Sequence, residues 1–81
     1  GMNEVKNSAI SISQNENQGI VLQSKEEFHY SVYNSLGELI ARGENRNQIT
    51  SIESKEWPAG IYLVNVETAH QRITRRIIIA R

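Results

Sequence analysis

Apolar residues alternate with polar ones along most of this chain, and that period of two constrains its fold more than any other feature. Successive side chains of a β-strand point to opposite faces, so the pattern is that of strands with one buried face. Isoleucine and valine dominate the apolar positions, which favours strands over helices. No window of about ten residues carries the i, i+3, i+4 spacing of an amphipathic helix. The sequence therefore predicts an all-β fold.

Seven segments carry the pattern, at a spacing of roughly eight to twelve residues that is typical of small β-sandwiches. The predicted strands are 8–13, 19–24, 28–33, 38–43, 48–54, 61–67 and 71–80. Turn-forming residues stand between them, most clearly in Asn34-Ser35-Leu36-Gly37 and Trp57-Pro58-Ala59-Gly60. Glycine tolerates the positive φ of tight turns, and proline cannot donate to a strand ladder. We predict one antiparallel β-sandwich of about seven strands.

Two of the predicted strands have apolar side chains on both faces. The strand at 61–67 begins with Ile61, Tyr62 and Leu63, which predicts a central strand covered on both sides. The last strand contains the run Ile77-Ile78-Ile79. This run predicts either burial on both faces or pairing with something outside the domain.

The 81 residues are enough for one domain with one core. We assign the domain to residues 8–81 and expect residues 1–7, which are mostly polar, to be flexible. Gly1 before Met2 is interpreted as a scar of tag removal, with Met2 as the native start. No stretch approaches the roughly 18 apolar residues of a membrane-spanning helix, and no basic-then-apolar leader opens the chain.

The formal net charge is zero, but the charges are spread unevenly. Residues 1–57 carry eight glutamates against five Lys or Arg, whereas residues 58–81 carry Glu67 against Arg72, Arg75, Arg76 and Arg81. Such a basic end could meet an acidic surface, a lipid headgroup region or nucleic acid. Alternatively, it is a solvated edge strand that its charges protect from aggregation.

Groups for catalysis or metal binding are scarce. The chain has no cysteine and no aspartate, so it can form neither a disulfide nor an aspartate-dependent dyad or calcium loop. Of its two histidines, His29 falls on an outward strand position and His70 in a hairpin loop. Glu26 and Glu27 are adjacent, so on an extended chain they point to opposite faces. We predict no enzymatic activity, no cofactor and no metal site.

The basic and aromatic residues raise two further kinds of binding, to nucleic acid and to glycans. Arg72, Arg75 and Arg76 lack the interleaved aromatic residues of a nucleic-acid platform, and the zero net charge also speaks against nucleic acid. Trp57 and Tyr33 are candidate glycan contacts, but Trp57 is better interpreted as closing the end of the core beside Pro58.

From Ser31 onward, the order of features resembles a known family. A strand from Val32 enters the turn with Gly37, and after a polar loop come Ile52 and the corner at 57–60. The strand Ile61-Tyr62-Leu63-Val64-Asn65-Val66 follows, and the chain closes on Thr74-Arg75-Arg76-Ile77-Ile78-Ile79. This order is similar to the C-terminal sorting domain carried by cargo of the type IX (Por) secretion system of Bacteroidetes.

The resemblance implies an immunoglobulin-like sandwich without enzymatic activity. In that family, the domain directs a passenger across the outer membrane, is recognised by the secretion machinery and is then removed. It implies that Gly37 shapes the hairpin and that Gly60 and Tyr62 set the corner, where the Tyr62 hydroxyl would bond back to nearby backbone as in a tyrosine corner. It also implies an extracytoplasmic location, in the periplasm, on the cell surface or outside the cell.

The recognition element implied by the resemblance is the last strand, which could add to a sheet edge of a partner. Its candidate residues are Arg72, Arg75, Arg76, Ile77, Ile78 and Ile79. The alternative function is that of a free-standing small secreted or accessory protein that binds a protein partner or a glycan and retains only the fold of the family. An edge strand would also allow homo-oligomers to form.

Overall fold

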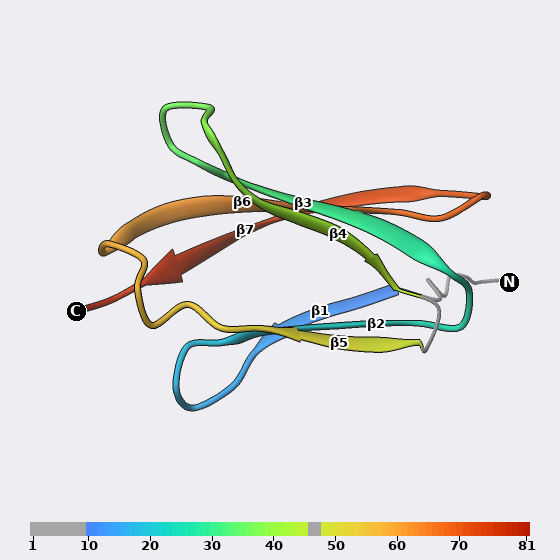
Figure 1. Ribbon diagram of the computed structural model, residues 1–81, viewed down its shortest axis with the longest axis horizontal. Helices are drawn as coiled ribbons and strands as arrows, with labels where there is room; N and C mark the ends of the chain where they lie inside the picture. The colour runs from blue at the N-terminus through green and yellow to red at the C-terminus, as the bar shows by residue number, and fades with distance from the viewer. Residues whose placement is uncertain (1–9, 46–47) are drawn as a thin grey trace, which may run out of the picture.

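The computed structural model describes residues 10–45 and 48–81, and these form seven β-strands in two antiparallel sheets. The sheets stack as two layers, with β1, β2 and β5 in one and β3, β4, β6 and β7 in the other (Figure 1). The predicted all-β sandwich of seven strands is therefore confirmed. The predicted flexible segment 1–7 lies outside the described residues. Within them, no helix is long and apolar enough to cross a membrane.

The smaller sheet has the strand order β1-β2-β5. Its strands are β1 (Ile10–Gln14), β2 (Ile20–Ser24) and β5 (Ile49–Ile52). The fifth strand is shorter than the predicted 48–54, because the chain turns after Ile52 and the Ser54 hydroxyl donates to the Gln18 carbonyl at 2.8 Å.

The larger sheet has the order β4-β3-β6-β7. Its strands are β3 (Phe28–Asn34), β4 (Leu39–Asn45), β6 (Gly60–Glu67) and β7 (Arg72–Ile79). The register of β3 and β4 shifts between Val32 and Tyr33, which is the mark of a β-bulge. β4 runs past the predicted end at Gly43, since Glu44 and Asn45 pair with the start of β3 instead of forming a loop.

The connectivity is that of an immunoglobulin-like sandwich. If β1, β2, β3, β4, β5, β6 and β7 are read as strands A, B, C, C′, E, F and G, the sheets are A-B-E and C′-C-F-G. The chain changes sheet between β2 and β3, between β4 and β5, and between β5 and β6. The family fold implied by the sequence is thus the observed one.

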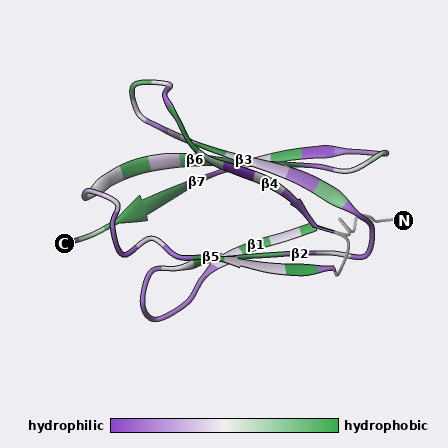
Figure 2. Cartoon of the chain, in the orientation of Figure 1, coloured by the Kyte–Doolittle hydropathy of each residue, from purple (hydrophilic) through white to green (hydrophobic). Residues whose placement is uncertain are grey.

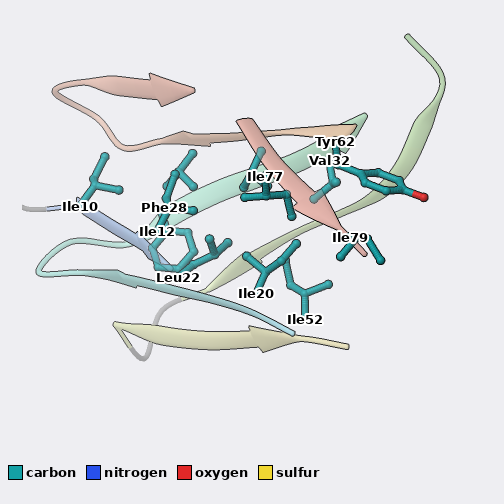
Figure 3. Packing of buried hydrophobic residues seen from close by; sticks show 12 residues of the cluster. Ile10, Ile12, Ile20, Leu22, Phe28, Val32, Ile52, Tyr62, Ile77 and Ile79 are labelled. Atoms are coloured by element: carbon teal, nitrogen blue, oxygen red, sulfur yellow. The ribbon is translucent and has the colours of Figure 1, made fainter. Parts of the chain in front are cut away.

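The core fills the space between the two layers (Figure 3). Each sheet contributes the inward half of its alternating residues, as the period of two requires. The buried members are Ile10, Ile12, Ile20, Leu22, Phe28, Val32, Ile52, Tyr62, Val64, Val66, Ile77 and Ile79. β7 therefore supplies part of the core, which matters for any experiment that removes it.

Both turns predicted from their glycines have the expected chemistry. In the β3–β4 turn, Gly37 has a φ of 85° and donates its N–H to the Asn34 carbonyl at 3.0 Å. The Asn34 side chain accepts from the N–H groups of Leu36 and Glu38 at 2.9 and 3.0 Å. At the start of β6, the Tyr62 hydroxyl donates to the Pro58 carbonyl at 2.6 Å, which is the hydrogen bond expected of a tyrosine corner.

The prediction that β6 is covered on both faces is wrong. β6 is central in its sheet, but Ile61 and Leu63 remain 43% and 41% exposed on the face turned away from the core. Of the two alternatives given for the last strand, burial on both faces is excluded for β7, because Ile77 and Ile79 are buried but Ile78 is 57% exposed. A sandwich has only two layers, and within the described residues no third layer covers the outer face of the larger sheet.

Candidate functional site

The candidate site is the last strand, β7, which lies at the edge of the larger sheet and pairs with β6. Its side chains alternate between the two faces, because residues opposite one another on paired strands share a face. On the inner face, Ile77 lies opposite Tyr62, and Arg75 lies opposite Val64. On the outer face are Arg72, Thr74, Arg76 and Ile78, which lie opposite Glu67, Asn65, Leu63 and Ile61. The hydropathy of β7 also changes along its length, and the strand ends in a hydrophobic stretch (Figure 2).

The predicted recognition residues thus divide into two kinds. Ile77 and Ile79 are 5% and 1% exposed and anchor β7 in the core. Ile78 and the three arginines are exposed to solvent. Only the second kind can touch a partner of the folded domain.

The arginines differ in their surroundings. An Arg72 Nη2 lies 3.7 Å from Glu67 Oε2, in an ion pair whose side chains are both more than half exposed. Within residues 10–45 and 48–81, no carboxylate lies within ion-pair distance of Arg75 or Arg76. Arg75 is also a charged side chain on the inward side of an edge strand, a device that discourages uncontrolled edge-to-edge pairing.

The free edge of β7 is covered at one end by glutamine side chains from the other sheet. Gln14 Nε2 donates to the Ile78 carbonyl at 3.1 Å. The Gln18 amide donates to the Ala80 carbonyl at 2.7 Å and accepts the Ala80 N–H at 2.6 Å. These amides take the place that a neighbouring strand would occupy.

The residue after Ala80 is held in a similar way. The guanidinium of Arg81 donates to the carbonyls of Ser54, Lys55 and Trp57, the last at 3.0 Å from Nη2 and 3.2 Å from Nε. One end of β7 is therefore fixed to the β1–β2 hairpin and to the β5–β6 connection. The stretch Arg72–Arg76 carries the arginine side chains and leads away from these contacts.

The other residues singled out in the sequence are not brought to β7. His29 is exposed on the outer face of β3, with Nδ1 3.7 Å from Glu44 Oε2. His70, in the β6–β7 connection, places Nδ1 2.6 Å from Glu26 Oε2 and so links two loops. Glu26 and Glu27 lie in the connection between β2 and β3, since β2 ends at Ser24 and β3 begins at Phe28.

The two candidate glycan contacts do not form one platform. Trp57 is half-buried, packs against the core and lies 5.1 Å from Tyr62 between ring centroids. This agrees with its interpretation as a closure of the core end. Tyr33 lies on the opposite face of the larger sheet, beside Leu39 and Leu63.

The model of the secretion system C-terminal sorting domain family matches residues 6–80, which is most of the chain. The chain belongs to this family. Sorting domains of the type IX pathway are non-catalytic signals that the secretion machinery recognises, and they mark proteins for export to the cell surface or outside the cell. No curated protein matches the chain.

The structure of this sorting domain offers little for catalysis in the part that is described. There, no group of three or more His, Cys, Asp or Glu side chains could hold a metal ion. An open hollow of about 460 Å³ lies at one end of the larger sheet, among Glu27, His29, Glu44 and Glu67. Two of these carboxylates are already paired, Glu44 with His29 and Glu67 with Arg72.

The contacts that the sequence did not reveal are those of Gln14, Gln18 and Arg81. In the sequence, the glutamines belong to an ordinary polar turn and the arginine to a basic end. Their bonds span 62 to 64 residues for the glutamines and 24 to 27 for Arg81, so no local pattern announces them. The sorting domain uses them to hold β7 in place.

Proposed function

We propose that the secretion machinery reads this sorting domain through β7, and chiefly through the stretch Arg72–Arg76. The observation that carries the proposal is that β7 is an edge strand whose Arg75 and Arg76 have no carboxylate within ion-pair distance in the described residues. An arginine without a partner offers five N–H donors to a carboxylate on another molecule.

The mode of recognition that fits this strand is β-augmentation. A partner strand would bond to the free backbone edge of β7, and the arginines on its two faces would select acidic neighbours. The glutamine side chains already occupy the edge at Ile78 and Ala80. Pairing is therefore proposed for the half of β7 that precedes Ile78.

Within this proposal, the isoleucines have separate roles. Ile77 and Ile79 keep β7 registered against β6 because their side chains are part of the core. Ile78 points outward and is available for an apolar contact. Deleting residues 72–81 would remove core residues along with the recognition element, so it would not separate misfolding from lost recognition.

The test is a reporter fused in front of the domain, with a signal peptide, in a bacterium that has a working type IX pathway. The double variant R75E/R76E is expected to lower export of the reporter at least about tenfold, since it turns attraction for an acidic partner into repulsion. R42E is the matched control, because Arg42 is an exposed arginine on the opposite edge strand, β4.

Circular dichroism of the purified domain variants must show the wild-type fold for the comparison to hold. Undiminished export of a folded R75E/R76E fusion would overturn the proposal. An equal loss of export with R42E would also overturn the proposal, since export would then depend on the charge of the domain and not on the position of the arginines in β7.

A further inference from the structure

The outer face of the larger sheet carries an apolar patch at one end. Its apolar members are four exposed residues, Leu39 (49%), Ile61 (43%), Leu63 (41%) and Ile78 (57%). Tyr33 lies among them, opposite both Leu39 and Leu63. The exposed Arg76 lies at the edge of the patch on β7, opposite Leu63. Apolar side chains gathered on one face of a small domain, as opposed to scattered singly, mark a surface for association.

The opposite end of the same face is a row of charged and titratable side chains. The strand registers place Glu44, His29, Glu67 and Arg72 side by side across β4, β3, β6 and β7. Acidic groups on β4 and β6 therefore alternate with basic ones on β3 and β7. Between this row and the patch lies a polar row made of Arg42, Ser31, Asn65 and Thr74.

We infer that this outer face pairs with the same face of a second copy of the chain. The two copies are related by a two-fold axis that lies between their two larger sheets, in the plane of the contact, and runs parallel to the strands. Such an axis keeps each row opposite its own row but reverses the strand order, so that β4 covers β7 and β3 covers β6. In the charged row, Glu44 then meets Arg72 of the second copy. His29 meets Glu67. In the row Leu39, Tyr33, Leu63 and Arg76, Tyr33 meets Leu63, and Leu39 meets the aliphatic stem of Arg76 at the rim of the contact, where the guanidinium stays in water.

The self-complementary order of charges is what identifies the occupant as a second copy. In an isologous contact, if a residue of the first copy meets a second residue in the other copy, the reverse pair forms as well. When the row Glu44, His29, Glu67, Arg72 is laid against itself in reverse order, each such pair joins an acidic residue to a basic one. Its two outer members are a carboxylate and a guanidinium. The zero net charge of the chain adds no repulsion between copies.

The other two-fold axis, perpendicular to the strands, does not fit. Centred on the face, it would set the charged row against the apolar patch and bury those charges without partners, which is strongly unfavourable. Centred on the patch, it would leave the charged row outside the contact and its charges without counterparts in the second copy. Packed sheets align within about 30°, and the long side chains of Glu44 and Arg72 can span the displacement that this angle produces at the outer strands. The arrangement with parallel axis is therefore the favoured one.

The first test measures the oligomeric state of the isolated domain by analytical ultracentrifugation, from about 1 µM to about 1 mM. The wild type is expected to dimerise within this range, and L63E is expected to raise the dissociation constant at least about tenfold because it puts a charge in the middle of the patch. I49E is the matched control, since Ile49 is 53% exposed on the smaller sheet. A strictly monomeric wild type, or equal weakening by I49E, would overturn the inference.

The second test uses charge reversal at the two outer strands. E44R and R72E should each weaken dimerisation, because each sets like charges against one another across the axis. An equimolar mixture of the two variants should dimerise again, since both contacts then join a carboxylate to a guanidinium. If the mixture stays as monomeric as its components, the parallel two-fold arrangement is wrong.

This inference does not rest on the proposed sorting function, although both use the outward side chains of Arg72, Arg76 and Ile78, and the two are tested by different measurements. Dimerisation is measured on the purified domain, whereas recognition of β7 is measured as export of a fusion. Dimerisation without loss of export in R75E/R76E would sink the sorting proposal alone, and the reverse result would sink the dimer alone.

Discussion

The side-chain amide of Gln18 bonds to the backbone of Ala80 in both directions, with Nε2 2.7 Å from the carbonyl oxygen and Oε1 2.6 Å from the N–H. The pair joins residues 62 positions apart and connects the β1–β2 turn of one sheet to the end of β7 in the other. The Gln18 carbonyl also accepts from the Ser54 hydroxyl at 2.8 Å. One residue thus ties three segments together, at a position where it adopts a φ of 67°.

We predict that Gln18→Met lowers the free energy of unfolding by about 1 to 2 kcal/mol, because it removes both hydrogen bonds to Ala80 while keeping the length of the side chain. Chemical denaturation measures the loss, and the Ala80 amide should exchange faster with solvent. Gln23→Met on β2, an exposed position, is the control. If the two variants unfold alike, the hydrogen bonds between Gln18 and Ala80 have no role in stability.

Neighbouring isoleucines of β7 should respond very differently to truncation. Ile79 is 1% exposed, so Ile79→Ala should lower the free energy of unfolding by about 2 to 5 kcal/mol through lost burial and a cavity. Ile78 is 57% exposed, and Ile78→Ala should change it by less than about 0.5 kcal/mol. Thermal and urea unfolding at a protein concentration well below the dissociation constant of the proposed dimer make the comparison. Similar losses for both variants would contradict the assigned faces of β7.

The hydroxyl of Tyr62 should stabilise the corner before β6. Tyr62→Phe removes the bond to the Pro58 carbonyl without changing the ring that packs on Trp57, so we expect a loss of about 1 kcal/mol. Tyr33→Phe on the outer face is the matched control and should change stability by less than about 0.5 kcal/mol. Urea titrations of both variants decide the matter, and an equal effect would mean that the corner bond contributes nothing of its own.

Stability should fall in acid partly because of Glu26. A hydrogen bond from the Thr68 side chain, and then the contact with His70, lower the pKa of the Glu26 carboxyl below its ordinary value. A carboxyl whose pKa is lower in the folded state stabilises that state above the pKa of the unfolded chain, about 4.3, and loses this effect as the pH falls through the lower folded value.

The glutamine variant of this residue tests the pH dependence. We expect Glu26→Gln to be less stable than the wild type at pH values above about 5, and this difference to shrink as the pH drops below about 4. Urea unfolding across this range measures it, with Glu27→Gln as the neighbouring control. A difference between wild type and Glu26→Gln that stays constant with pH would refute the role of this carboxyl.

Much of the fold follows from local chemistry. Alternation along Ile10–Gln14 or Phe28–Asn34 identifies a strand and its buried half because neighbouring side chains must point to opposite faces. The turn at Asn34 to Gly37 and the corner before Tyr62 depend on residues within four positions of one another. Such features are visible in sequence because the groups that interact are also near in the chain. Strand ends depend on the partner strand as well, because pairing with β3 extends β4 through Glu44 and Asn45, beyond its alternating pattern.

The surfaces of the larger sheet depend instead on which strands become neighbours. Ile61, Leu63 and Ile78 have the composition of buried residues, and nothing in their local sequence tells an outer face from an inner one. The row from Glu44 to Arg72 exists because β4, β3, β6 and β7 are assembled in that order from distant segments. The same holds for Gln18 and Ala80, whose contact arises when the two sheets stack. Periodicity is a property of one strand and is visible in its sequence. Which face of a sheet is covered, which strand lies at an edge and which side chains meet between the sheets depend on pairs of distant segments, and these segments come together only when the chain has folded.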